Sequence, residues 1–181
     1  PQMQDALKTS VSSVSGADRP GSKPAQAPPA AAGLFRYQRQ VAFPALGLTG
    51  QQRIAAGRVL IVGVGGLGTW AAELLARAGV GRLRLVDDDG VDFSNLPRQA
   101  LYDERDAGAA RAKVQAAARR LAELRGDLAV EPVRARLHAG NAEALAEDID
   151  VILDGTDNFA ARFLLNDLAV KRGLPWIFAG A

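Results

Sequence analysis

A glycine-rich turn, residues 63–68 with the sequence GVGGLG, constrains the fold of this chain more than any other feature. It lies between an apolar run, RVLIVG, and a run with helical spacing, GLGTWAAELLARAGVG. A G-x-G-x-x-G sequence in that context joins the first strand of a βαβ unit to its helix. Glycines allow close backbone approach, and the free N–H groups of a helix N-terminus attract phosphates. We therefore expect a nucleotide site lined by Gly63, Gly65 and Gly66.

The rest of the chain continues the alternation of strand-like and helix-like segments. RLRLVD, VRARL, VILD and PWIFAGA have strand character, and RAKVQAAARRLAEL and FAARFLLNDLAVKRG have helical spacing. This order predicts an α/β fold: a doubly wound, mostly parallel Rossmann-like sheet with helices on both faces. Two short amphipathic stretches in residues 34–57 predict N-terminal helices, with Thr49 as a candidate N-cap.

Apolar residues of the first long helix share one stripe, which we expect to be buried, and Gly79 follows as a C-cap. The stripe consists of Leu67, Trp70, Ala71, Leu74 and Leu75. Trp70 is thus expected in the core.

The chain divides into three parts by composition. Residues 1–33 are rich in Ser, Pro, Ala and Gly and predict a disordered tail, 34–57 a helical segment, and 58–181 the Rossmann-like nucleotide-binding domain. The N-terminal PQMQDALKTS has no export signature, and no apolar run could cross a bilayer, so we expect a cytoplasmic protein without a membrane partner.

Charge and composition narrow the functional classes. The sequence has 22 Lys and Arg against 20 Asp and Glu, a net charge of +2, so nucleic acid is not an expected partner. With no cysteine and one histidine, this chain offers no disulfide, no thiolate zinc site and no cysteine nucleophile. Its chemistry must come from Asp, Arg, Lys, Asn and backbone amides.

Acidic residues follow the second predicted strand. Asp87 ends that strand, where a carboxylate can accept hydrogen bonds from ribose hydroxyls, and Asp89 follows on the same side. The alternative is a polar turn without a ligand. These features and the glycine turn fit an NAD(P)-dependent oxidoreductase equally well.

Three further motifs are RYQRQ at 36–40, SNLPRQ at 94–99 and DGTDN at 154–158. With the glycine turn and the DDD sequence at 87–89, in this order over residues 34–181, the chain resembles the ThiF/MoeB/HesA family of ubiquitin-activating-like adenylyltransferases. The resemblance implies ATP-dependent adenylation of the C-terminal Gly-Gly carboxylate of a ubiquitin-like sulfur-carrier protein of thiamine or molybdopterin type, with release of pyrophosphate. ATP and Mg²⁺ are the implied cofactors.

The resemblance also implies roles for residues of the three motifs. Arg98 would bind phosphate oxygens in a planar contact, and Ser94 and Asn95 would lie at the nucleotide. Asp157 would hold Mg²⁺ with Asn158 supporting its turn. Arg98 and Asp157 would thus be catalytic.

Arg39, in RYQRQ, would be a third catalytic residue, since the family places this arginine over the phosphates of the partner subunit. The resemblance therefore implies a homodimer with shared sites. Each residue also has an ordinary explanation. Arg98 and Arg39 would be solvated charges, Asn95 a turn former, and Asp157 the N-cap of the following helix.

One position departs from the family pattern. Where the family carries a lysine after the Asn-Leu-x-Arg loop, this chain has Arg111, which keeps the charge but changes its donor geometry. Lys113 is close, but two residues along a helix it would face elsewhere, so we expect Arg111 at the nucleotide.

Segments that follow the last strand in the family have no counterpart here, so we expect the domain to be truncated at its C-terminus. The competing hypotheses are an NAD(P)-dependent oxidoreductase, which leaves SNLPRQ unexplained, and a non-catalytic nucleotide-binding fragment.

Overall fold

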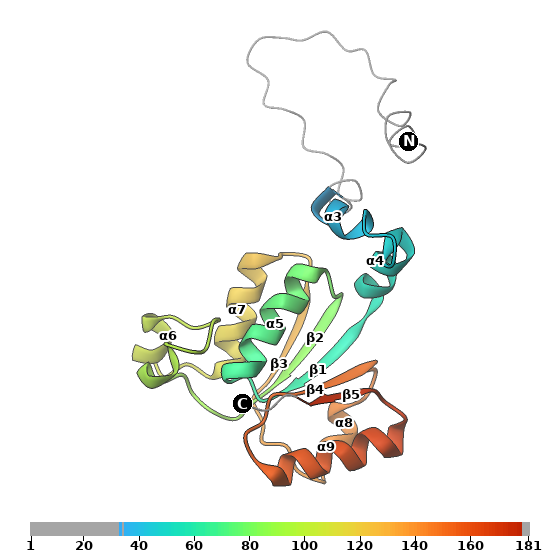
Figure 1. Ribbon diagram of the computed structural model, residues 1–181. Coiled ribbons are helices and arrows are strands. Elements are labelled where there is room, and N and C mark those ends of the chain that lie inside the picture. Colours follow the sequence, from blue (N-terminus) through green and yellow to red (C-terminus); the bar gives the residue numbers. More distant parts are fainter. Residues whose placement is uncertain (1–32, 34, 179–181) are drawn as a thin grey trace, which may run out of the picture. The chain divides into compact units, whose positions relative to one another are not determined.

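The computed structural model describes residues 33 and 35–178 (Figure 1). The expected disordered tail at 1–33 lies outside the described residues except for Gly33. Residues Tyr37–Ala181 form one compact unit, separate from Pro1–Arg36, and the elements described below belong to it.

Five parallel strands form a single sheet in the order β3-β2-β1-β4-β5. They are β1 (Arg58–Val62), β2 (Arg82–Val86), β3 (Ala129–Val133), β4 (Val151–Asp154) and β5 (Trp176–Phe178). The chain proceeds from β1 outward through β2 to β3, then returns to add β4 and β5 on the other side of β1. The strand order therefore reverses between β1 and β4, and ligands of such sheets bind at the carboxyl ends of the strands at this reversal. The predicted fold class is confirmed.

Helices cover both faces of the sheet (Figure 1). Helices α5 (Gly66–Ala78) and α7 (Lys113–Leu124) pack on one face, where Ile61, Leu83 and Leu85 are fully buried. Helices α8 (Ala142–Leu145) and α9 (Phe159–Arg172) pack on the other, over Leu60 and Ile152. In the described part of the chain, no helix combines the length and apolar character needed to span a bilayer.

The predicted N-terminal helices are α3 (Gln38–Val41) and α4 (Gly47–Ala56). The side-chain amides of Gln40 and Gln51 both donate to the Ala78 carbonyl, at 3.1 and 3.0 Å, and so attach α3 and α4 to the C-terminal end of α5. Thr49 is not the N-cap, because α4 begins two residues earlier, after Leu46.

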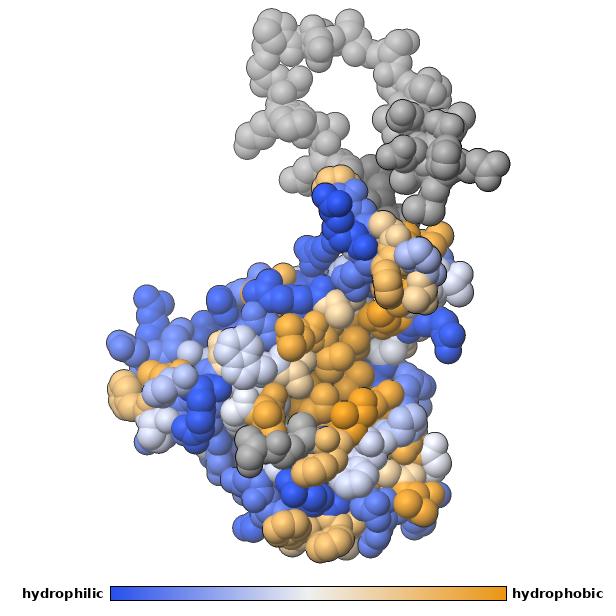
Figure 2. All heavy atoms as spheres, viewed as in Figure 1, coloured by the Kyte–Doolittle hydropathy of each residue, from blue (hydrophilic) through white to orange (hydrophobic). Residues whose placement is uncertain are grey.

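The predicted buried stripe of α5 is wrong for Trp70 and Leu74, although Leu75 packs against the core. Trp70 and Leu74 are 53% and 63% exposed, and the face toward the sheet carries the small residues Gly68, Thr69, Ala72 and Ala76. Small residues bring the helix backbone close to the strands, and Trp70 and Leu74 face outward. Figure 2 shows apolar side chains gathered between α5 and strands β4 and β5. Gly79 is the predicted C-cap, with φ of 101°.

The third strand also differs from its prediction. It occupies AVEPV at 129–133 rather than VRARL at 133–137. Pro132 cannot donate to a ladder, but β3 is an edge strand, where a proline is tolerated. Three short helices were not predicted: η1 (Phe93–Asn95), α6 (Glu104–Gly108) and α8. The first two lie in the connection from β2 to α7.

Candidate nucleotide-binding site

The glycine turn after β1 and the turn after β4 pack backbone against backbone. A Cβ atom at Gly63 would lie 2.6 Å from the Gly155 carbonyl oxygen, and one at Gly155 would lie 2.6 Å from the Gly63 oxygen. Gly63 also has a positive φ of 84°. Only glycine fits at both positions. The two predicted motifs thus meet at the carboxyl ends of adjacent strands.

Helix α5 begins directly on the glycine turn. A Cβ at Gly68 would overlap the Gly63 carbonyl oxygen, so glycine at this position lets the first turn of α5 approach the loop. The N-cap is Gly65, which supplies no side-chain hydrogen bond to the first N–H groups of the helix. Such groups carry partial positive charge and form a ready site for phosphate.

Two side chains fix the peptide groups of Val64 within the glycine turn. Asp87 Oδ2 accepts a hydrogen bond from the Val64 N–H at 2.8 Å, and the buried Tyr102 hydroxyl donates to the Val64 carbonyl at 2.6 Å. Burial raises the pKa of Tyr102 above its ordinary value, and the nearby charges of Asp87, Asp106 and Asp89 raise it further, so the hydroxyl remains a donor. Asp87, expected at the ribose, therefore also anchors the loop.

Lys113, rather than Arg111, forms an ion pair with the acidic turn. Lys113 Nζ lies 2.7 Å from Asp89 Oδ2, and the lysine side chain is 9% exposed. The expectation that Lys113 faces elsewhere is wrong because Arg111 precedes α7, whose first residue is Lys113, so helical spacing does not relate the two. Arg111 Nε instead pairs with Asp106 Oδ1 at 3.1 Å.

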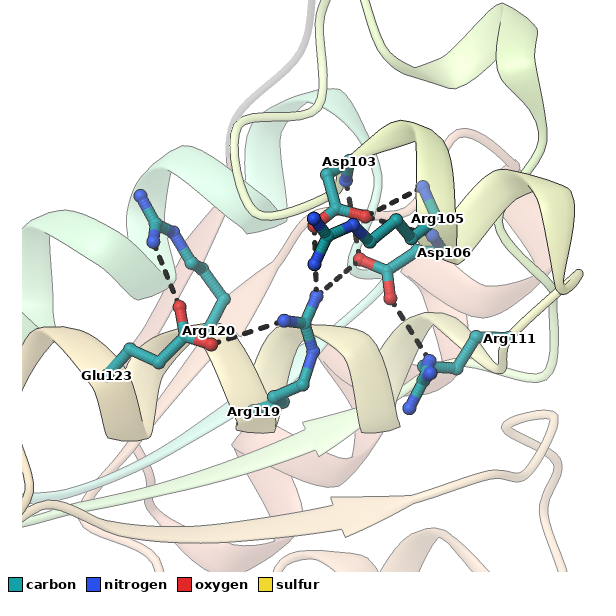
Figure 3. Close-up of polar contacts among 7 residues, drawn as sticks. All are labelled: Asp103, Arg105, Asp106, Arg111, Arg119, Arg120 and Glu123. Atoms are coloured by element: carbon teal, nitrogen blue, oxygen red, sulfur yellow. Dashed lines mark hydrogen bonds and ion pairs between the residues drawn. The ribbon is translucent and has the colours of Figure 1, made fainter.

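Asp106 is the centre of an ion-pair network that holds the connection between β2 and α7 (Figure 3). Its fully buried carboxylate pairs with Arg111 and accepts a hydrogen bond from Arg119 Nη2 at 2.9 Å. Asp103 caps α6 and also contacts Arg119, and the Asp106 backbone N–H is the main cause that lowers the pKa of Asp103. The network connects α6 to α7 and so supports the loop that precedes α6.

That loop carries Ser94, Asn95 and Arg98. The aliphatic stem of Arg98 lies over Gly66, 3.9 Å from the position of a Cβ atom there. Its Nη1 donates to the Ser94 carbonyl at 2.7 Å, so the guanidinium contacts its own loop. Asn95 is buried, and its Oδ1 accepts from the Asp92 N–H, which leaves its NH₂ group for a ligand.

Gln99 was missed by the sequence analysis, although it ends the SNLPRQ motif. It is 3% exposed, and its Nε2 is the nearest atom to the Cβ position at Gly65, at 3.9 Å. Its Oε1 is buried and has no hydrogen-bond partner among the described residues. Its place directly after Arg98, within the motif, was the available signal.

Asp154, the last residue of β4, is fully buried and accepts hydrogen bonds from the Thr156 N–H and hydroxyl, at 2.9 and 2.7 Å. Asn158 is the N-cap of α9 and accepts from the Ala161 N–H at 2.9 Å, so the alternative that Asp157 is the cap is wrong. Asp157 is exposed, and its carboxylate forms no hydrogen bond or ion pair among the described residues. It is an oxygen ligand of the type that Mg²⁺ prefers.

Arg39 lies far from the glycine turn of its own chain. It is exposed on α3, which Gln40 attaches to Ala78 at the C-terminal end of α5. The glycine turn lies at the other end of this 13-residue helix, about 20 Å away at the helical rise per residue. Arg39 therefore does not join the site of its own chain.

The sequence profile of the ThiF family matches residues 37–181, which include all the motifs above except Arg36. The chain belongs to the ThiF family. Two curated relatives are the sulfur carrier protein ThiS adenylyltransferase of Bacillus subtilis (strain 168), 42% identical over 143 residues, and the adenylyltransferase and sulfurtransferase uba4 of Aspergillus fumigatus (strain CBS 144.89 / FGSC A1163 / CEA10), 48% identical over 146 residues. These matches cover 79% and 81% of this chain but only 43% and 29% of the relatives, so the chain spans less than half of their length.

The fold of this ThiF-family chain is similar to a crystal structure of Escherichia coli tRNA N6-threonylcarbamoyladenosine dehydratase, TcdA, in complex with ATP. The TM-score is 0.75 at 26% identity, over 82% of this chain and 60% of the other.

The contact at Gly68 generates a prediction. Gly68→Ala places a methyl group against the Gly63 carbonyl, and the backbone must separate to accept it. We expect the free energy of unfolding to fall by about 3 kcal/mol in urea denaturation. Gly126→Ala is the control, because nothing lies within 4 Å of a Cβ there. Equal stability of the two variants would contradict the close approach.

Proposed function

We propose that this chain binds Mg-ATP around the N-terminus of α5 and adenylates the C-terminal Gly-Gly carboxylate of a ubiquitin-like sulfur-carrier protein. The main support is that three motifs meet: the glycine turn, the SNLPRQ loop and the DGTDN turn. Gly155 packs on Gly63, and the aliphatic stem of Arg98 lies over Gly66. Asp157, whose carboxylate is exposed, follows Gly155 by two residues in the same turn, so we infer that it faces the same ligand as Arg98 and the α5 N-terminus. A triphosphate requires this combination of anion-binding groups and a metal ligand.

In the proposed reaction, an oxygen of the carrier carboxylate attacks the α-phosphorus of ATP. The new bond forms an acyl-adenylate, and the bond to the β-phosphate oxygen breaks, so pyrophosphate leaves with its negative charge. No general base is required, because the carboxylate is already ionised. Arg98 and the α5 N–H groups would stabilise charge on the phosphates, and Asp157 would hold Mg²⁺, which neutralises the leaving group.

Lys113 is proposed as a second phosphate-binding cation. Its ammonium group already lies at the carboxyl end of β2, paired with Asp89, whose side chain is 65% exposed. An incoming phosphate could share this ammonium group, whose three donors suit several acceptors. Arg111, in contrast, is paired with the fully buried Asp106, and leaving that carboxylate would be costly.

The relatives support a carrier protein as the substrate. Two of them, at 42% and 48% identity, are named for sulfur-carrier adenylylation and for adenylyl and sulfur transfer. The TcdA structure is less similar, at 26% identity, but it is a complex with ATP, which supports ATP as the nucleotide. These similarities favour the adenylyltransferase over the oxidoreductase, and either a thiamine or a molybdopterin type of carrier is compatible with them.

Exchange of labelled pyrophosphate into ATP tests the proposed function, with a carrier that ends in Gly-Gly supplied. We expect carrier-dependent exchange in the wild-type chain. Asp157→Asn and Arg98→Ala should each lower the exchange rate on the order of a hundredfold, since each removes a group at the transferring phosphate.

Asp167→Asn is the matched control, because it removes the same charge from an exposed position on α9. NADH binding without ATP binding would favour the oxidoreductase. ATP binding without exchange would favour a non-catalytic nucleotide-binding fragment.

The two cations near α7 make a second test. Lys113→Ala should lower the exchange rate by about a hundredfold, with little change in the thermal midpoint. Arg111→Ala should lower the thermal midpoint, because the buried carboxylate of Asp106 loses one of its two arginine partners. The exchange rate of the folded fraction should change by about threefold or less. A large loss of exchange in Arg111→Ala, with little loss in Lys113→Ala, would instead indicate that Arg111 binds the phosphate.

We propose further that the chain acts as a homodimer in which Arg39 reaches the site of the partner subunit. Arg39 is held at the far end of α5 from its own glycine turn, and this supports action across an interface.

Mixing two inactive variants, Arg39→Ala and Asp157→Ala, tests this arrangement. Each hybrid dimer has one site with both residues intact, so we expect an equimolar, fully exchanged mixture to recover about a quarter of the wild-type exchange activity. Hybrid formation is measured by mass spectrometry of differently tagged subunits. Hybrid dimers without activity would rule out Arg39 acting in the partner site.

A further inference from the structure

Trp70 lies on the outward side of the first turns of α5 and contacts the loop that carries Arg98. Its indole Nε1 donates a hydrogen bond to the Arg98 carbonyl oxygen at 3.2 Å. The side chain is otherwise poorly buried, since the residue is 53% exposed. An exposed tryptophan contributes little to a core, so this hydrogen bond is its main specific contact.

The neighbouring residue holds the same loop from the buried side of the helix. Thr69 is fully buried, and its hydroxyl donates to the Gly65 carbonyl at 2.7 Å and accepts from the Ala100 N–H at 3.2 Å. Thr69 and Trp70 therefore bind the backbone on both sides of Gln99. The segment 98–100 is attached to the first turn of α5, which is also the proposed phosphate site.

Arg98 depends on such an attachment, because its own side chain does not provide one. The residue is exposed, and its guanidinium bonds only to the Ser94 carbonyl of the same loop among the described residues. That contact cannot fix the loop relative to α5. The backbone contacts to Thr69 and Trp70 therefore hold Arg98, whose aliphatic stem lies over Gly66, against the first turn of α5.

We infer that Trp70 is a positioning residue that holds Arg98 over the N-terminus of α5 for the triphosphate. This inference rests on the proposed function. It assigns the role to the indole N–H, and not to the burial of the ring. Trp70→Phe keeps an aromatic ring on the helix but removes the donor.

The first measurement is the affinity of the full chain for Mg-ATP by calorimetry. Trp70→Phe should weaken binding by about threefold to tenfold, the value of one such hydrogen bond, while the thermal midpoint stays unchanged. Leu74→Ala is the matched control, because Leu74 is 63% exposed one turn further along α5. It should bind Mg-ATP as the wild-type chain does.

A double-mutant cycle separates positioning from general damage. In an Arg98→Ala background, Trp70→Phe should cause no further loss of ATP affinity, because the group that it positions is already absent. Equal losses in both backgrounds would overturn the inference, as would unchanged affinity of Trp70→Phe in the wild-type background.

The indole itself provides an independent signal. The chain has two tryptophans, Trp70 and Trp176, so Trp176→Phe leaves Trp70 as the single reporter. Saturating Mg-ATP should change its fluorescence with the same midpoint as the calorimetric titration, and Arg98→Ala should abolish that change. A wild-type chain that binds no ATP would contradict the proposed function, whereas ATP binding without a Trp70 response would contradict only the positioning role.

Discussion

The contact between Gly63 and Gly155 is the constraint on which the site depends. A side chain at either position would force the glycine turn and the 154–158 turn apart, because the obstacle is backbone on both sides. Their contact occurs where the sheet reverses its strand order, between β1 and β4. It brings the first turn of α5, which begins on the glycine turn, beside the 154–158 turn that carries Asp157, so the groups proposed for phosphate and for metal come from adjacent turns.

The groups that hold this arrangement are mostly distinct from those that remain free for a ligand. Tyr102 and Asp87 fix the Val64 peptide groups, and the buried Asp106 holds the connection before α7. Arg98 and Asp157 are exposed. Preorganised scaffolding with a few free polar groups lowers the reorganisation that a reacting phosphate would otherwise require. Asp87 is an exception, since it anchors the turn and also lies at the expected ribose position.

The sequence was sufficient for the fold class and for the strands at 58–62, 82–86 and 151–154, because apolar runs next to glycine turns are strong local signals. It was insufficient where the answer depended on tertiary packing. Helix α5 has apolar residues on two sides, and periodicity alone could not show that the side with Ala72 and Ala76 faces the sheet. Lys113 was misjudged for a related reason: α7 begins at that residue, so a helical angle from Arg111 did not apply.

The two proposed phosphate cations differ in a way that follows from their burial. Lys113 is nearly enclosed, and an enclosed ammonium group requires a partner, which Asp89 supplies at 2.7 Å. Arg98 is exposed and bonds only to a carbonyl of its own loop among the described residues. Its guanidinium can therefore leave that carbonyl at small cost, because water replaces the bond. Lys113 is thus suited to a fixed contact, whereas Arg98 is suited to follow the phosphate whose charge changes during transfer, provided that its backbone stays in place.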